Sequence, residues 1–432
     1  MNYVQAIQAS ANNAKALEDL YQAARRDRQT GEFAADLRTC QQASPDNVLY
    51  AAWYYRFLAQ PEQAESRSIN WQAAVPLGAV VGIIFAVLAN SRFSLPRHAP
   101  FLVYAWAPTS TCFIIAFLMI TARQNQKRAW SVIAGLIAIG AYVTLFITLT
   151  NREQYELLMV LHLPLLAWIG TGAFVLGTRP DPQNRFAFLI KSVEVFVTAG
   201  LYTLAGGVFA VITFGLFQAL GIQIPTEVQQ ALVAGGGGLI AVLAVASVYD
   251  PRSSPIEQKF EQGLGRLIPT LTRLLLPLTL LVLLVYCFAI PFNFMQPFRN
   301  RDVLIVYNAG LFAVMALLVG VTPVREEDLA QKYHRLLRTG ILAVASLATL
   351  ISLYALSATI YRTALGGWTV NRLTIVGWNT INIGILATLI FRQFKDGAAA
   401  WIRSAQSVFS GAAVAYTVWT LFLIVATPLL FK

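Results

Sequence analysis

The sequence predicts an all-α protein, a polytopic bundle of about 11 transmembrane helices that follows a small cytoplasmic helical leader. Two observations lead to this fold class. Hydrophobic residues make up 57% of the 432 residues and charged residues only 12%, which is outside the usual balance of soluble domains. Apolar segments long enough to cross about 30 Å of hydrocarbon recur between short polar connections. Strands of a barrel would be shorter and alternating, so these segments are predicted to be helices.

The predicted transmembrane domain covers residues 71–432, and each of its spans is an apolar segment bounded by polar residues. The eleven predicted spans are 71–89, 99–121, 129–150, 157–176, 188–217, 228–248, 271–290, 304–321, 336–356, 374–391 and 405–430.

The positions of Lys and Arg predict the orientation of this bundle, because basic residues concentrate in cytoplasmic connections. With the N-terminus placed inside, 23 of the 32 Lys and Arg residues, seven of them in the leader, fall on the cytoplasmic side and eight on the outside. Arg273 and Arg338, at the starts of their spans, are counted with the connections beside them, and the remaining residue, Lys191, lies within a span. One span missed or added in the middle would reverse every later connection and remove this bias. The count therefore predicts a cytoplasmic N-terminus and an extracytoplasmic C-terminus.

The leader, residues 1–70, is rich in Ala, Gln, Asp and Arg and is predicted to form a separate helical unit. Apolar residues at helical spacing predict a first helix at 16–24, and a second is predicted at 33–43. Residues 44–47, Ser-Pro-Asp-Asn, then supply a stop and an N-terminal cap for a third helix.

Part of the leader, residues 31–35 and 43–47, resembles the second half of a tetratricopeptide repeat. A single degenerate unit is below the roughly three repeats that stabilise such an array. One interpretation is therefore a helical hairpin that caps the membrane bundle. The other is a docking site through which residues 1–65 bind a protein partner.

No motif for a cofactor or for catalysis is found, so an enzyme has no chemical support in the sequence. The three cysteines are Cys40, Cys112 and Cys287, too scattered for a disulfide framework or a zinc site. There is no carboxylate dyad, Ser-His-Asp set or thiol pair, and nothing calls for haem, flavin, nucleotide or metal. The formal charge of +11 is spread over short connections, which indicates membrane orientation and not nucleic-acid binding.

Polar residues inside predicted spans are the candidate sites, because each is costly in hydrocarbon unless it is paired or hydrated. Lys191 and Glu194 lie three residues apart on one helix face and form either a proton or ion relay or a simple neighbour pair near the cytoplasmic end. His162 either shuttles protons or is a hydrogen-bonded structural histidine. Asn379 and Asn382 either line a polar cavity or hydrogen-bond across helices.

Four consecutive glycines at 235–238 occupy the middle of the sixth predicted span, with Gly236 and Gly237 at their centre. Glycine weakens a helix and also allows close backbone approach. One interpretation is a broken helix that exposes backbone groups to a substrate, as in several transporter folds. The other is tight packing against a neighbouring helix.

Residues 367–372, Gly-Trp-Thr-Val-Asn-Arg, open the tenth span after a short outer connection. This stretch resembles the signature of a family of bacterial polytopic membrane proteins known as domain of unknown function 4153. The resemblance implies a location in the bacterial cytoplasmic (inner) membrane and no particular activity. Thr369 and Asn371 are expected to cap the incoming helix, with Arg372 at the outer interface. The functional alternative for Thr369, Asn371 and Arg372 is a contact with an anion or a lipid headgroup at the outer rim.

Three classes of function are consistent with this sequence. A transporter or permease is favoured by the number of spans, the glycine run and the Lys191 and Glu194 pair. The alternative is a noncatalytic accessory or scaffold subunit of a larger membrane complex, favoured by the sparse intramembrane charge and by the leader. A membrane enzyme acting on lipid-linked substrates is least supported, because the outer connections are short. The sequence does not identify a substrate.

Overall fold

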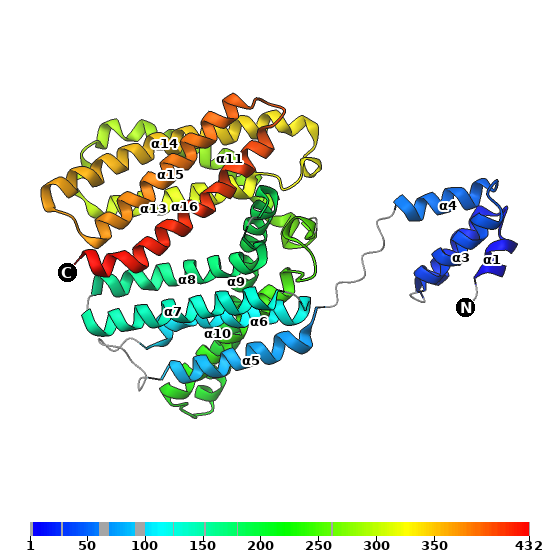
Figure 1. Cartoon of the computed structure of the whole chain (residues 1–432), viewed down its shortest axis with the longest axis horizontal. Coiled ribbons are helices and arrows are strands. Elements are labelled where there is room, and N and C mark those ends of the chain that lie inside the picture. The colour runs from blue at the N-terminus through cyan, green and yellow to red at the C-terminus, as the bar shows by residue number, and fades with distance from the viewer. Residues whose placement is uncertain are drawn as a thin grey trace. The chain divides into compact units, whose positions relative to one another are not determined.

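The structure, a computed structural model, describes residues 3–26, 29–59, 69–90, 100–123, 125–150, 153–178, 180–260 and 262–431. The described residues form helices and connections, with no strand among them, and the predicted all-α class is therefore confirmed. The chain divides into two compact units, Met1–Ile69 and Asn70–Lys432 (Figure 1). The first is called the leader unit below, and the second the membrane unit.

The leader unit has an apolar core built around aromatic side chains. The rings of Tyr21 and Phe33 both pack on Trp53, at centroid distances of 5.2 and 6.1 Å. Three of its helices correspond to the predicted ones, and the short first helix was not predicted from the sequence. The helices of this unit are α1 (Val4–Ala9), α2 (Ala14–Arg26), α3 (Thr30–Ala43) and α4 (Val48–Ala59).

Asn47 caps α4, as the sequence predicts. Its Oδ1 accepts hydrogen bonds from the backbone N–H groups of Leu49 and Tyr50, at 2.9 and 3.1 Å. Its Nδ2 donates to the carbonyl of Ala11 at 3.0 Å, and the hydroxyl of Tyr50 donates to the carbonyl of Ile7 at 3.1 Å. The start of α4 is therefore joined to the chain around α1, which explains how a six-residue helix is held in place.

Among the described residues, the membrane unit has eleven helices that are long and apolar enough to cross a membrane, and each predicted span lies within one of them apart from a few terminal residues. The chain is therefore a multi-pass membrane protein. The eleven helices are α5 (Trp71–Leu88), α6 (Leu102–Ala122), α7 (Gln126–Thr150), α8 (Glu153–Leu176), α9 (Pro182–Ala219), α10 (Thr226–Val248), α11 (Leu264–Ala289), α13 (Arg301–Val321), α14 (Gln331–Gly366), α15 (Val370–Lys395) and α16 (Trp401–Leu430). Shorter elements in the connections are η3 (Pro255–Glu257), η4 (Pro291–Asn293), α12 (Gln296–Arg299) and η5 (Glu326–Asp328).

Helix α16 joins two groups of helices. On one side it packs against α8, which lies beside α6 and α7, and on the other it packs against α15, which lies beside α14 (Figure 1). The larger apolar core lies between α9, α11, α13, α14, α15 and α16 and includes Leu318, Ile341 and Phe409. A second core between α8 and its neighbours includes Met159 and Leu423.

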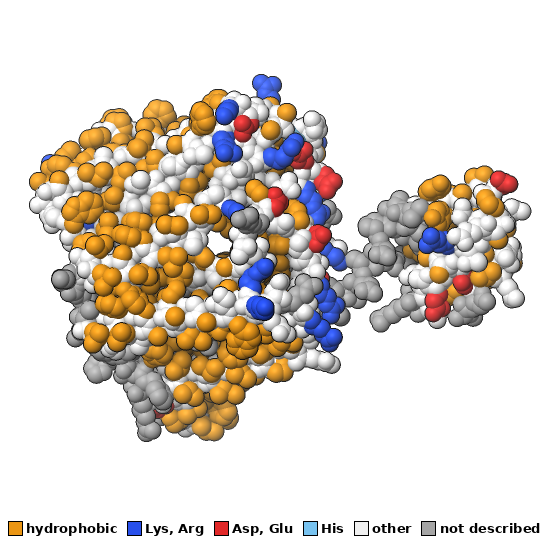
Figure 2. All heavy atoms as spheres, in the orientation of Figure 1, with side chains coloured by type: hydrophobic (Ala, Val, Ile, Leu, Met, Phe, Trp, Pro, Cys, Tyr) orange, Lys and Arg blue, Asp and Glu red, His pale blue; other side chains and the backbone are white. Residues whose placement is uncertain are grey.

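Lys and Arg gather at one end of the membrane unit, along its right-hand edge in Figure 2. This end carries the α6–α7, α8–α9, α10–α11, α13–α14 and α15–α16 connections and is called the basic end below. The opposite end carries the α14–α15 turn and the C-terminal end of α16 (Figure 1). The basic residues that the sequence assigns to alternate connections are thus on one side of the bundle.

The second half of α9 exposes large apolar side chains. Leu204, Phe209 and Val211 are 67%, 72% and 72% exposed, whereas Phe186 and Ala187 in the first half are buried. An apolar surface of this extent is unfavourable in water and is what a bilayer covers.

Candidate functional site

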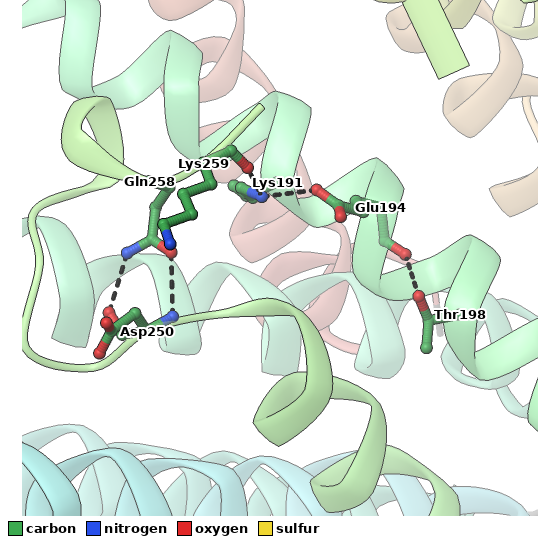
Figure 3. Close-up of polar contacts among 6 residues, drawn as sticks. All are labelled: Lys191, Glu194, Thr198, Asp250, Gln258 and Lys259. Carbon is green, nitrogen blue, oxygen red and sulfur yellow. Dashed lines mark hydrogen bonds and ion pairs between the residues drawn. The ribbon is translucent and has the colours of Figure 1, made fainter. Parts of the chain in front are cut away.

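Lys191 and Glu194 form a buried ion pair in the first half of α9. Lys191 Nζ lies 2.7 Å from Glu194 Oε2, and the two side chains are only 4% and 11% exposed. Lys191 also donates a hydrogen bond of 2.5 Å to the carbonyl of Lys259 (Figure 3). Its Nζ lies 4.8 Å from the ring centre of Phe260. The pairing that the three-residue spacing predicts is confirmed. Lys191 does not reach out to water; it attaches the α10–α11 connection to α9.

That connection is also held together internally by Gln258. Its Oε1 accepts a hydrogen bond from the backbone N–H of Asp250 at 2.9 Å, and its Nε2 donates to the carbonyls of Asp250 and Ser253 at 2.8 and 3.1 Å (Figure 3). Arg325 from the α13–α14 connection donates to the carbonyl of Ile256 at 3.0 Å. The Lys191 pair therefore holds a folded connection and not a loose loop.

A polar cavity of about 510 Å³ lies beside this connection at the basic end. Its lining includes Arg266 and Arg273 of α11 and Asp328 of η5. Arg273 Nε is buried, has no hydrogen-bond partner and belongs to a side chain that forms no ion pair with a described residue. Asp328 is close enough for its charge to act on Arg273, and its Oδ2 also accepts a hydrogen bond from the backbone N–H of Arg325 at 2.8 Å. The cavity thus presents two guanidinium groups against one carboxylate.

Sequence reasoning missed this cavity because it counted Arg273 with the preceding connection. A signal was present: Arg266 and Arg273 are seven residues apart, which puts both on one face of α11.

His162 is a hydrogen-bonded histidine in α8. Its Nδ1 lies 2.8 Å from the carbonyl of Leu158, and its Nε2 accepts from the indole N–H of Trp378 in α15 at 3.2 Å. Since a carbonyl can only accept, the proton of the neutral ring is on Nδ1. Both ring nitrogens therefore have partners, which supports the structural interpretation of His162 over the shuttle.

Asn379 and Asn382 lie in α15 and are 2% and 0% exposed. The hydroxyl of Tyr416 in α16 donates to Asn382 Oδ1, which is the predicted hydrogen bond across helices. The Nδ2 atoms of both asparagines and Oγ1 of Thr420 have no hydrogen-bond partner. A strip of buried polar groups with unused donors thus runs along the α15–α16 interface.

The glycines at 235–238 have two kinds of surroundings: Gly235 and Gly238 pack against α5, whereas Gly236 and Gly237 face open space. Helix α10 continues through all four residues, so the expectation of a broken helix is wrong. A Cβ on Gly238 would lie 2.7 Å from the Cα of Gly82 in α5, and Gly235 also faces Gly82. A Cβ on Gly236 or Gly237 would meet nothing within 4 Å.

Gly236 and Gly237 instead line an apolar cavity of about 960 Å³ between α6, α8, α9 and α10. Gly206 and Gly207 of α9 line it from the other side. The two glycine pairs widen a groove that lies at membrane depth.

Thr369, Asn371 and Arg372 lie together in a cavity of about 240 Å³ at the opposite end of the bundle. Thr369 is the N-cap of α15, with its Oγ1 accepting from the backbone N–H of Arg372 at 3.3 Å. Asn371 is the second residue of α15 and lines the cavity, so the expectation that it caps α15 is wrong. The structure adds Arg362 of α14 and Gln154 of α8 to the lining, which their distance in sequence concealed.

Glu156 of α8 is a further buried polar residue that the sequence reasoning missed. It is 6% exposed, and its Oε1 has no hydrogen-bond partner. Its position one residue before the predicted span at 157–176 made it resemble a residue of the connection.

Comparison of the chain with known proteins identifies no relative. No protein-family model, no curated protein and no solved structure matches the chain. The resemblance of residues 367–372 to the bacterial family described above stays a prediction. Among the residues that the structure describes, no group of three or more His, Cys, Asp or Glu side chains is placed to hold a metal ion.

Proposed function

We propose that this multi-pass membrane protein is a permease for a small anionic solute. The observation that carries the proposal is the 510 Å³ cavity at the basic end, with the partnerless Nε of Arg273 in its wall. A buried guanidinium nitrogen without a partner is costly and marks a place where an acceptor on a ligand would be stabilised. Arg273 lies nine residues into α11, or about 14 Å along the helix axis.

Beyond Arg273 along α11, the side chains that face α13 and α14 are apolar and packed. Leu276, one turn beyond Arg273, is buried together with Leu318 of α13 and Ile341 of α14. Passage of a solute therefore requires these helices to move. Pro269 and Pro277 lie inside α11, four residues on either side of Arg273, and each removes a backbone hydrogen bond and weakens the helix there. Helix α11 continues through both prolines, so these positions are where it can bend without ending.

The test is solute flux in proteoliposomes that contain the full chain. Labelled phosphate, sulfate and dicarboxylates are offered in turn, and Arg273→Gln is compared with wild type. The matched control is Arg403→Gln at the same end, whose side chain is 66% exposed in a surface ion pair with Glu326. We expect flux of at least one anion that falls more than tenfold in Arg273→Gln and persists in Arg403→Gln. Absence of flux for every anion, or equal flux in both variants, would contradict the proposal.

The same cavity bears on the predicted relay, because Ile190 and Phe260, neighbours of the Lys191 pair, line it. In the permease proposal the pair of Lys191 and Glu194 positions the cavity wall. If Glu194 is instead part of a proton or ion relay, Glu194→Gln is expected to abolish flux while the protein stays folded.

We further propose that the basic end faces the cytoplasm of a bacterium and that the C-terminus is outside. The distribution of Lys and Arg supports this orientation. A cysteine-free background with a single cysteine at Leu365, at the opposite end, or at Lys395, at the basic end, provides the test. A membrane-impermeant maleimide should label Leu365→Cys in intact cells and Lys395→Cys only after lysis. The reverse pattern would show the opposite orientation.

The second candidate function is a noncatalytic accessory subunit. It is favoured by apolar side chains on the surface of α4, where Val48 and Tyr55 are 81% and 65% exposed and lie on one helix face. It predicts partners that purify with the full chain and are lost on deletion of residues 1–65. Unchanged association after that deletion would argue against the role of the leader unit.

A further inference from the structure

The cavity at the opposite end of the bundle is lined by two arginine side chains from different helices. Arg362 comes from the last turns of α14 and Arg372 from the first turn of α15, and both are half-buried. Helices α8 and α13 close the other sides, with Gln154 and Leu304 in the lining. The volume of about 240 Å³ is several times the roughly 30 Å³ that one water molecule takes up in the liquid.

Each guanidinium group is fixed by a neutral partner, and no carboxylate of a described residue pairs with it. Arg362 donates from one terminal nitrogen to the carbonyl of Arg299 at 3.0 Å, and Arg372 donates to the carbonyl of Gly367 at 2.6 Å. Neither side chain forms an ion pair with any residue that the structure describes, and no acidic side chain among those described residues lines the cavity. A guanidinium group has five N–H donors, so most of them remain for a ligand.

The backbone around Arg372 is arranged to hold that side chain over the cavity. A Cβ on Gly366 would lie 2.7 Å from one terminal nitrogen of Arg372 and 2.8 Å from the other, so only glycine leaves the guanidinium in its place. Gly367 has a φ of 75°, in the left-handed region that favours glycine, and ends α14. The N-terminus of the 26-residue helix α15 faces the same region and adds partial positive charge to the two arginines.

We infer that this cavity is a binding site for a phosphate-type oxyanion, held by Arg362 and Arg372. Two planar guanidinium forks match the oxygens of a phosphoryl group in a way that two ammonium groups do not. The amides of Gln154 and Asn371 supply further donors. Ile305 and Ile375 give the site an apolar side, so the anion is either a soluble phosphate or the phosphate of a lipid headgroup. The inference does not depend on the proposed transport function.

The experiment uses the full chain, purified in a neutral detergent, with two probes. Inorganic phosphate is titrated by calorimetry, and retention of phosphatidylglycerol against phosphatidylcholine is measured by native mass spectrometry. The variants are Arg362→Gln and Arg372→Gln, and Arg403→Gln at the basic end is the control of equal charge. For a soluble anion we expect phosphate binding to weaken at least tenfold in both variants and to be unchanged in the control. For a lipid headgroup we expect the same pattern in retained phosphatidylglycerol and no binding of phosphate.

A second variant separates positioning from folding. Gly366→Ala pushes against the far end of a flexible side chain and not against backbone, so we expect the melting temperature to stay within about 2 °C of wild type while binding weakens severalfold. If neither probe binds the wild-type protein, or if Arg362→Gln and Arg372→Gln bind both probes as the wild type does, the inference is overturned.

Discussion

The indole N–H of Trp378 donates a hydrogen bond to Nε2 of His162 at 3.2 Å and so joins α15 to α8. The ring of Trp378 also packs edge-on against Phe312 of α13 and Tyr416 of α16, so one histidine–tryptophan pair lies where four helices meet. A comparable bond occurs at the basic end, where the indole of Trp401 donates to His334 Nδ1 at 3.4 Å. At both places the indole N–H of a tryptophan donates a hydrogen bond to a histidine ring nitrogen.

The hydrogen bond between Trp378 and His162 should stabilise the bundle, and His162 should not be needed for any pH dependence of flux. Trp378→Phe removes the donor and leaves a buried imidazole nitrogen without a partner, which costs about 1 to 3 kcal/mol. His162→Gln should cost a similar amount. The measurement is the free energy of unfolding of the purified protein in mixed detergent. A proton-carrying role would appear instead as flux that loses its dependence on pH in His162→Gln at unchanged stability.

The buried pair of Lys191 and Glu194 should be far more sensitive than a surface pair. Glu194→Gln removes the carboxylate that lies beside the buried ammonium group of Lys191, with an expected loss of about 3 to 5 kcal/mol. Glu326→Gln, which removes the surface partner of Arg403, should cost less than about 1 kcal/mol. Both variants are compared in the same unfolding assay. Equal small losses would mean that Lys191 finds water or another partner.

The glycines of α10 should divide into two classes. Gly238→Ala forces the new methyl group against the backbone of Gly82, so α5 and α10 must separate at a cost of about 1 to 3 kcal/mol. Gly237→Ala meets open space and should stabilise α10 by up to about 1 kcal/mol through helix propensity. Thermal unfolding of the two variants checks the order. Equal effects would show that the two positions do not face different surroundings.

Cys40 of the leader unit should react slowly with alkylating reagents. Burial, with a smaller contribution from the nearby charge of Asp36, raises the pKa of its thiol. A raised pKa lowers the fraction of reactive thiolate at any pH below it, and the side chain is only 2% exposed. With Cys112 and Cys287 replaced by Ser, iodoacetamide should modify the native protein at least tenfold more slowly than the denatured protein at pH 8. Similar rates would mean that the leader unit opens readily.

Much of the architecture can be read from local properties of the sequence. A span is recognised by its apolar length, because the backbone in a bilayer must satisfy its own hydrogen bonds within the segment. The ends are less well predicted. Helix α14 was expected at 336–356 but runs to Gly366. The hydroxyls of Thr359 and Thr363 beyond the apolar stretch donate to carbonyls of the same helix, so these polar residues are satisfied within it. Hydropathy measures the hydrocarbon crossing and not the length of the helix.

The candidate sites were predicted only where both partners are neighbours in the chain. Lys191 and Glu194 are three residues apart, and Thr369 caps the helix that begins beside it. The 510 Å³ cavity was not predicted, because Arg273 was counted with the connection before its span and Asp328 comes from another element, η5.

The sequence by itself determined the all-α class, the eleven apolar helices and the alternation of basic connections. Only the tertiary structure decided that Trp378 hydrogen-bonds to His162, 216 residues away. It also decided that Arg362 shares a cavity with Arg372 and Gln154, and that Gly238 packs against Gly82. The reason is physical. Helix formation in a membrane depends on the backbone and apolar length of one segment, whereas the rotation and crossing of each helix depend on many weak packing contacts with segments far away in the chain.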